Sequence, residues 1–259
     1  MRDLPASKAV ERFRREQPWP DRQLWCFGHA GAGAAEFRTW PVLLGPDVLV
    51  CAVRLPGRER RLTDPLSPAI GEVAEQISAE IGGLVSPRSV FYGQCLGAFL
   101  AFEVAVRLEN RGQTPPGHLF LASQVAPHCT ADETTARDIS DDYAMFRETL
   151  ADLGGLPPGV LENDELWALL EPTLRADFLL LEDYAKGSFT RLPVTAGITA
   201  VIGADDNTPR AQLEAWAAYS TISFDLVVIE NGGHFLTRTS EREVTTLMRH
   251  FMGGEAGQA

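Results

Sequence analysis

The chain has 259 residues, 45% of them hydrophobic and 22% charged, which is the composition of an ordinary globular protein and excludes a disordered, collagen-like or coiled-coil chain. Its 23 Lys and Arg against 35 Asp and Glu give a net charge of −12, which argues against general nucleic-acid binding because that needs a basic surface. No apolar run approaches the roughly 18 residues of a membrane span, and the polar N-terminus lacks the apolar core of a signal peptide. We therefore expect a cytoplasmic protein with no membrane or nucleic-acid partner.

Short apolar runs alternate with helical stretches along the first half of the chain. The predicted strands are 23–27, 47–53, 89–93 and 118–123, and the predicted helices are 34–44, 69–85 and 96–110. Strands that alternate with helices in this way predict a parallel sheet covered by helices on both faces.

The alternation stops after Ser123 and resumes near residue 197. Two helical candidates, at 139–155 and 163–185, fill the region between, which contains no convincing strand. Further strands are predicted at 197–203 and 225–230, and further helices at 211–220 and 240–252. We interpret the chain as a polar arm (1–20), one α/β domain (21–252) with a helical insertion at about 125–190, and a flexible tail (253–259).

The sharpest motif is Gly93-Gln94-Cys95-Leu96-Gly97, between a predicted strand and a predicted helix. It matches the G-x-nucleophile-x-G turn of the α/β-hydrolases, with Cys where Ser is usual. The turn strains the backbone of the nucleophile, and glycines two residues before and after it avoid collisions. The helix that follows points its N-terminus at the side chain, which favours a thiolate and an oxyanion. We therefore predict that Cys95 is a catalytic nucleophile.

An α/β-hydrolase carries its acid and its base after later strands, in the order nucleophile, acid, base. The segment VIGADDN offers Asp205 and Asp206 after one predicted strand, and ENGGHF offers His234 after the last. An imidazole base needs a carboxylate to fix its tautomer and orientation. We predict His234 as the base and one of the two aspartates as its partner.

The glycine-rich loop GHAGAG at 28–33 lacks the GxGxxG spacing of a phosphate-binding loop. Its position suits a second oxyanion donor, so we expect the backbone N–H groups of Ala30 and Leu96 to converge on a developing negative oxygen. The four cysteines show no disulfide or zinc spacing, and no motif predicts a metal or a bound cofactor.

Taken together, these segments resemble the type II thioesterases, stand-alone α/β-hydrolases that accompany polyketide synthases and nonribosomal peptide synthetases. The matching segments are FGHAGAGAAEF (27–37), RLPGRERRL (54–62), YGQCLGAFLAFEVA (92–105), LEPTLRADFLLLEDY (170–184), the G-x-x-D at 203–206, Trp216 and GGHFL (232–236). The LRADF helix is the most specific of them, since generic hydrolases lack it. In that family it belongs to a helical lid, which fits the insertion at 125–190.

The resemblance implies release of acyl groups from the phosphopantetheine arm of an acyl or peptidyl carrier protein. It places Cys95, Asp206 and His234 in the triad, with Ala30 and Leu96 at the oxyanion hole, and it implies a monomer. The family usually has Ser at position 95 and His at position 94. Attack by a thiolate exchanges one thioester for another and leaves the acyl group activated, so transfer to an amine or alcohol, or cyclisation, is an alternative to hydrolysis.

Other interpretations follow from the same residues. A Cys-His-Asp hydrolase of small esters or lactones resembling dienelactone hydrolase, and a non-catalytic protein that holds a carrier protein, both fit the predicted fold. The arginine cluster forms either a docking site for an acidic carrier protein or a solvated turn, and the aromatic residues of 143–184 either line an acyl pocket or pack the lid. The arginines are Arg54, Arg58, Arg60 and Arg61; the aromatic and apolar residues are Tyr143, Met145, Phe146, Trp167, Phe178 and Tyr184.

Overall fold

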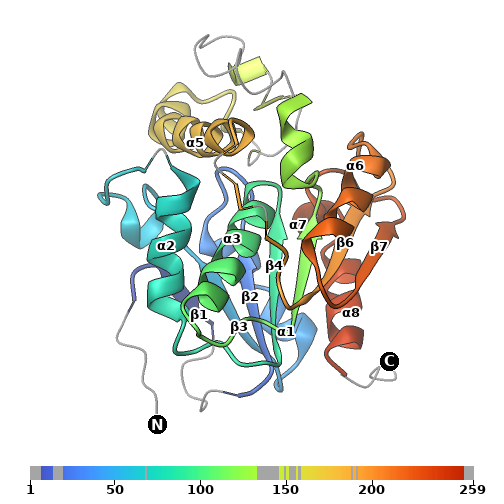
Figure 1. The fold of residues 1–259 in the computed structure, drawn as a ribbon. Coiled ribbons are helices and arrows are strands. Elements are labelled where there is room, and N and C mark those ends of the chain that lie inside the picture. The colour runs from blue at the N-terminus through green and yellow to red at the C-terminus, as the bar shows by residue number, and fades with distance from the viewer. Residues whose placement is uncertain are drawn as a thin grey trace.

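A seven-stranded sheet with helices on both faces forms the centre of the molecule (Figure 1). The computed structural model describes residues 7–13, 20–67, 69–132, 146–148, 150–151, 156, 159–187, 189–190 and 192–253. The strand order is β1-β3-β2-β4-β5-β6-β7, and all neighbours are parallel except β1, which is antiparallel to β3. The strands are β1 Val10–Arg12, β2 Gln23–Phe27, β3 Leu49–Val53, β4 Ser89–Gln94, β5 His118–Ala122, β6 Gly197–Gly203 and β7 Phe224–Ile229. The predicted α/β architecture with a mostly parallel sheet is confirmed.

The central strands bury both of their faces because helices cover each one. Trp25 and Phe27 of β2 pack into the core formed with α2 and α3, whereas Leu24 and Cys26 pack into the core formed with α1 and α8. This is why the strand reads as an unbroken apolar run. The α-helices are α1 Trp40–Leu44, α2 Ile70–Ile81, α3 Leu96–Asn110, α5 Asp164–Ala185, α6 Arg210–Glu214, α7 Leu236–Thr239 and α8 Glu241–Phe251. Among the described helices, none has the length and hydropathy to span a bilayer.

Three elements differ from the sequence expectation. Within the expected polar arm, β1 pairs with β3 in the register Val10↔Val53. The expected helix at 34–44 divides into a 3₁₀ helix, Ala34–Phe37, and α1, because Pro41 is best accommodated in a first helical turn. The expected helix at 211–220 likewise divides into α6 and a 3₁₀ helix, Ala215–Tyr219.

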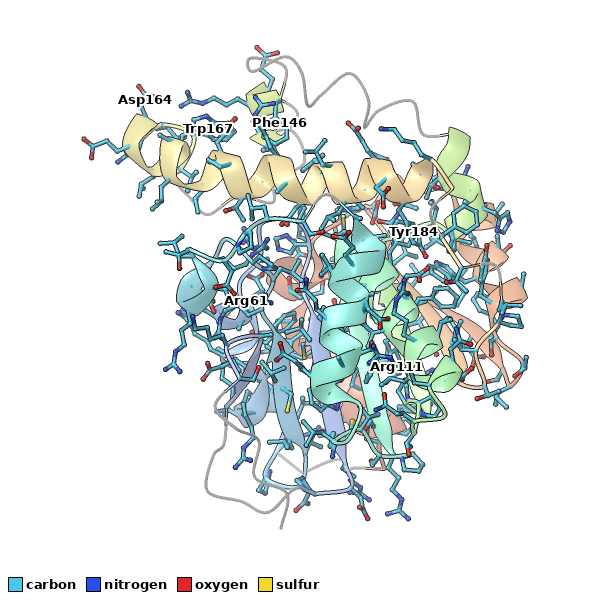
Figure 2. The ribbon with its side chains drawn as sticks, turned by 60° about the vertical axis from the view of Figure 1, so that its left-hand side comes forward. Arg61, Arg111, Phe146, Asp164, Trp167 and Tyr184 are labelled. Atoms are coloured by element: carbon cyan, nitrogen blue, oxygen red, sulfur yellow. The ribbon has the colours of Figure 1, made fainter. Side chains whose placement is uncertain are left out.

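The long helix α5 lies across the carboxyl ends of the parallel strands (Figures 1 and 2). It starts where the Asn163 side chain accepts the N–H groups of Glu165 and Leu166, both at 3.0 Å. The loop after β3 contacts it directly, since the Thr173 hydroxyl donates to the Gly57 carbonyl at 2.9 Å. The predicted helix at 163–185 is thereby confirmed, while most of the candidate at 139–155 lies outside the described residues.

A buried carboxylate fixes the C-terminal end of α5 to the core. Glu103 of α3 accepts the Tyr184 hydroxyl at 2.9 Å and the Thr190 N–H and hydroxyl at 2.8 and 2.9 Å. It also pairs with Arg107 one turn later on the same helix. The charge is thus fully partnered, and it joins α3 to both α5 and the segment that follows.

We expect Glu103→Ala to lower the free energy of unfolding by roughly 3 kcal/mol, because it leaves the buried Tyr184 hydroxyl and the Thr190 N–H without their acceptor and breaks the ion pair with Arg107. Urea denaturation measures the change. Thr190→Val is the matched control, since it removes one of these hydrogen bonds and should cost only about 1 kcal/mol. Equal losses in the two variants would contradict the assignment of Glu103 as the anchor.

Candidate active site

Cys95 occupies the bend between β4 and α3, with φ 52° and ψ −120°, a backbone conformation that costs a non-glycine residue about 1–3 kcal/mol. Its N–H still donates to the Ala122 carbonyl of β5 at 2.9 Å. A Cβ at Gly93 would lie 2.1 Å from the Gly97 carbonyl oxygen, and a Cβ at Gly97 would lie 2.1 Å from that of Phe27. The two glycines of the motif are therefore required by close backbone contacts. The thiol is partly exposed at the N-terminus of α3.

The loops that follow β6 and β7 meet at another close backbone contact. A Cβ at Gly203 would lie 2.0 Å from the Gly232 carbonyl oxygen, which accepts the Asp205 N–H at 2.9 Å. This contact brings the Asp206 carboxylate to His234, with 3.1 Å between Oδ2 and Nδ1. The side chain of His234 also lies close enough to Cys95 for the two to interact, which contributes to the raised pKa of His234. The structure thus brings together Cys95, His234 and Asp206, whereas Asp205 is exposed.

The electrostatics of the three side chains are coupled. Burial raises the pKa of Asp206, but hydrogen bonds from His234 and Thr208 outweigh burial and lower the pKa to about 2. Burial lowers the pKa of His234, but the contacts with Asp206 and Cys95 outweigh it and raise the pKa well above its ordinary value. The raised pKa of His234 favours the protonated form of the ring at neutral pH.

The buried side chain of Gln94 connects β4 to the segment that carries His234. Its Nε2 donates to the His234 carbonyl at 2.9 Å. Its Oε1 accepts the Thr237 N–H at 3.2 Å and the Tyr92 hydroxyl at 2.9 Å. Sequence reasoning noted Gln94 only as a departure from the family pattern, and its contact with a residue 140 positions away carries no local signal.

The loop at 28–33 lies beside the bend, since Gly97 packs against the carbonyl of Gly28. Within the loop, Gly31 has φ +81°, and the Ala32 N–H donates to the His29 carbonyl at 2.9 Å. The Ala30 and Leu96 amides donate to no protein acceptor in the part of the chain that the structure describes. Both amides are therefore available to an oxygen of a substrate.

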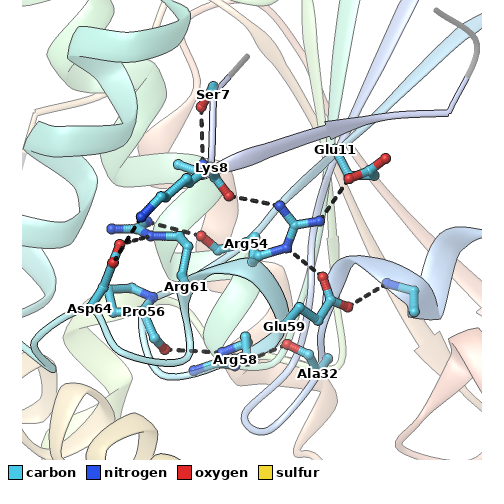
Figure 3. A network of polar contacts seen from close by, with 12 residues as sticks. Ser7, Lys8, Glu11, Ala32, Arg54, Pro56, Arg58, Glu59, Arg61 and Asp64 are labelled. Carbon is cyan, nitrogen blue, oxygen red and sulfur yellow. Dashed lines mark hydrogen bonds and ion pairs between the residues drawn. The ribbon is translucent and has the colours of Figure 1, made fainter.

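The arginine cluster is neither an exposed docking site nor a solvated turn, so both interpretations are wrong for three of its four members. Arg54, Arg58 and Arg61 are 3%, 7% and 9% exposed, and only Arg60 faces solvent. Each is held by carboxylates of the protein itself: Arg54 pairs with Glu11 and Glu59 and Arg61 pairs with Asp64 (Figure 3). Arg58 pairs with Asp177, which is itself buried. The physical reason is that this turn lies beneath α5, where its carbonyls and nearby carboxylates need buried donors.

The aromatic residues of the insertion pack against one another. Phe146, Trp167 and Phe178 are buried in one cluster (Figure 2), and Tyr184 packs on Phe99 with ring centroids 4.3 Å apart. The packing of these four residues agrees with the lid-packing interpretation. Tyr143 and Met145 lie outside the described residues.

A cavity of about 840 Å³ lies between residues 31–33 and α5. Leu169, Leu170 and Leu174 supply apolar lining, and Arg238 also lines the cavity. Cys95 and His234 do not line this cavity, although Gly31, the residue after Ala30, does.

The other conspicuous histidines have structural partners. Burial lowers the pKa of His118 to about 4, and its ring bonds with the Thr199 hydroxyl at 2.8 Å. His128 bonds with the Tyr219 hydroxyl at 3.1 Å. Within the described residues, no three His, Cys, Asp or Glu side chains are arranged to hold a metal ion.

A strained nucleophile turn on a mostly parallel sheet, with a histidine and an aspartate on the loops after its last two strands, defines an α/β-hydrolase. The profile of the Thioesterase domain family matches residues 22–253. The chain belongs to this family, and it is a thioester hydrolase.

The relatives agree with this assignment. The chain is 31% identical to the gramicidin S biosynthesis protein GrsT of Aneurinibacillus migulanus, with 87% of each chain covered. It is also 31% identical to the thioesterase PikA5 of Streptomyces venezuelae, with 90% of this chain and 82% of the relative covered.

Two solved structures give the same result. The RedJ thioesterase of the prodiginine biosynthetic pathway in Streptomyces coelicolor matches with a TM-score of 0.77 and 30% identity, covering 89% of this chain and 85% of that one. YbtT, a type II thioesterase from the yersiniabactin pathway, matches with a TM-score of 0.79 and 29% identity, covering 96% and 100%. The resemblance to type II thioesterases is confirmed.

We expect Gln94→Ala to slow alkylation of Cys95 by iodoacetamide about 10-fold, because the segment that carries His234 loses two of its hydrogen bonds to β4. Intact-protein mass spectrometry with peptide mapping measures the rate at Cys95. Tyr92→Phe is the control, since it leaves both bonds to that segment in place and should react at the wild-type rate. Equal rates in wild type and Gln94→Ala would contradict the positioning of His234 by this side chain.

The raised pKa of His234 predicts a pH-dependent contribution to stability. That contribution is fully present below the unfolded-state pKa, about 6.5, and is lost as the pH rises through the higher folded-state pKa. We expect the unfolding free energy of wild type to exceed that of His234→Gln by roughly 1–2 kcal/mol more at pH 6 than at pH 9. Urea denaturation at the two pH values measures this, and a difference that grows with pH would show that the ring is held neutral.

Proposed function

We propose that this protein is a type II thioesterase that removes acyl groups from the phosphopantetheine arm of an acyl or peptidyl carrier protein. The observation that carries the proposal is the meeting of Cys95, His234 and Asp206 at the carboxyl end of the sheet, in a member of the thioesterase family. Its relatives include proteins of gramicidin S biosynthesis and of the yersiniabactin pathway, which supports a place in nonribosomal peptide or polyketide biosynthesis.

The acylation step uses the three side chains in distinct roles. Asp206 accepts from Nδ1 of His234 and so leaves Nε2 for the sulfur. The Cys95 thiolate attacks the carbonyl carbon of the acyl thioester, and the carbonyl π electrons move to the oxygen. The N–H groups of Ala30 and Leu96 donate to that oxyanion, and each such donor contributes roughly 2.7–4 kcal/mol in comparable sites. The bond from carbon to the pantetheine sulfur then breaks, and the His234 imidazolium protonates the leaving thiolate.

Release completes the cycle. Neutral His234 takes a proton from a water molecule as that water attacks the acyl-cysteine carbonyl. When the tetrahedral intermediate collapses, the bond to Cys95 breaks, a carboxylic acid leaves, and the thiolate–imidazolium pair is restored.

Transfer of the acyl group to an amine or alcohol is a second candidate, and Cys95 itself favours it. Exchange of one thioester for another is close to isoenergetic, so the acyl group on Cys95 keeps its reactivity. An ester on serine would be less activated. A nucleophile other than water can therefore take the acyl group by the same step.

The insertion at 125–190 serves as the lid of this site in our proposal, within a domain that spans 21–252, includes β1 from the N-terminal segment and is followed by the tail 253–259. Helix α5 supplies the apolar wall of the 840 Å³ cavity, and that volume suits an acyl or pantetheine group.

The test exposes the protein to a panel of acyl-pantetheine thioesters and to an acylated carrier protein, with detection by intact-protein mass spectrometry. We expect wild type to gain the acyl mass and Cys95→Ala to gain none, because the thiolate is the only group in the mechanism that bonds the acyl carbon. The adduct should map to the peptide that contains Cys95. An adduct of equal yield in Cys95→Ala would exclude this mechanism.

Adding candidate amines and alcohols to the acylated enzyme separates the two outcomes of release. If only free acid forms with every acceptor, the transfer hypothesis falls and hydrolysis stands. A free lactone supplied in place of the carrier-bound thioester distinguishes a small-ester hydrolase, which would turn over the lactone faster.

A further inference from the structure

Both ends of one peptide group in the loop at 28–33 are held by buried side chains. The peptide between Ala30 and Gly31 accepts a hydrogen bond on its carbonyl from Nδ1 of His29, at 2.8 Å. Its N–H donates to Oδ2 of Asp177, at 2.7 Å. The amide of Ala30 belongs to the neighbouring peptide, one Cα away, so fixing this peptide restricts the direction in which that amide points.

The second oxygen of Asp177 closes a ring around the loop. Oδ1 accepts from Nη2 of Arg58 at 2.6 Å, and Nη1 of Arg58 donates to the Ala32 carbonyl at 2.9 Å. Nε of Arg58 donates to the Pro56 carbonyl at 3.3 Å. Asp177 and Arg58 are 2% and 7% exposed, so their ion pair is desolvated. A buried ion pair adds little to stability but holds its partners in one arrangement when every donor and acceptor is used.

Asp177 belongs to α5 rather than to the loop it holds. Three residues earlier on the same face of the helix, Leu174 lies against Gly31, where an added Cβ would be 2.5 Å from its Cδ2. On the other side of the loop, the ring of His29 packs edge-on against Phe235, with 4.7 Å between the ring centroids. The loop therefore lies between α5 and the segment next to His234.

We propose that Asp177 is a positioning residue for acyl transfer, which holds the Ala30 amide in place through the Ala30–Gly31 peptide and makes the oxyanion hole depend on the docking of α5. This inference rests on the function proposed above, since it requires that Ala30 stabilise an oxyanion. Asp177 acts through the loop and does not touch the reacting atoms. Its removal therefore affects the step that builds negative charge on oxygen and spares the reactivity of the sulfur.

Two reactions of the same thiol separate these effects. Alkylation by iodoacetamide displaces iodide at a saturated carbon and creates no oxyanion, whereas acylation by an acyl-pantetheine thioester does. Peptide mapping assigns both rates to Cys95. Cys26 and Cys51 are buried with raised pKa values and should remain unreactive, and mapping separates Cys129.

The test variant is Asp177→Asn, which keeps the shape of the side chain but removes the charge that pairs with Arg58. The matched control is Asp183→Asn on the same helix, whose carboxylate contacts the Ile70 N–H at 3.3 Å, away from the loop. We expect Asp177→Asn to slow acylation about 10- to 100-fold while alkylation stays within about twofold of wild type. Asp183→Asn should change neither rate.

The outcomes distinguish this inference from the proposed function. If wild type forms neither an acyl adduct nor free acid, the proposed function falls and the inference with it. If wild type acylates but Asp177→Asn acylates equally fast, or loses both reactions in parallel, only the inference falls. Should Asp177→Asn not fold, Arg58→Lys carries the same test, because it keeps the charge but replaces the three nitrogens that bond Asp177, Ala32 and Pro56 with a single one.

Discussion

The site depends on three close contacts between backbone segments, each of which is possible because a glycine has no Cβ. Gly93 lies against the Gly97 carbonyl, Gly97 lies against the Phe27 carbonyl, and Gly203 lies against that of Gly232. The first two contacts make the strained turn at Cys95 possible and set the loop after β2 beside it. The third joins the loops after β6 and β7. Any larger residue would move a loop by an ångström or more, a displacement that acyl transfer does not tolerate.

Buried charges, not surface charges, connect the insertion to the core. Glu103 fixes the C-terminal end of α5 to α3, and the Arg58–Asp177 pair fixes its middle to the loop after β2. Arg54 joins the loop after β3 to the edge strand β1. A hydrophobic contact in these places would bury apolar area without fixing the orientation of the two segments that it joins. A fully bonded ion pair fixes that orientation, which matters more for the loop after β2 than the small net gain in stability.

The sequence predicted the elements whose signals are local. The apolar runs located the buried strands, the glycines around Cys95 predicted the turn, and chain order pointed to His234. It did not predict β1, because Val10–Arg12 is too short and too polar to form a pattern. It also misplaced Arg58, because an arginine is ordinarily exposed and its partner lies 119 residues away. Roles that depend on such distant pairs leave no periodic signal.

The choice of cysteine gives the arrangement around Asp177 a further consequence. In the mechanism that we propose, the acyl-cysteine is still an activated thioester, so no less reactive intermediate protects the acyl group from water. The acyl group must instead be protected by the timing with which the oxyanion hole is assembled. If the Ala30 amide is aligned only while α5 is docked on Gly31, then the oxyanion hole and the cover over it form together, and deacylation is fast only under the lid. In the mechanism that we propose, the same helix then covers the site and completes the oxyanion hole, and the nucleophile present beneath α5, water or another acceptor, decides whether the acyl group is hydrolysed or transferred.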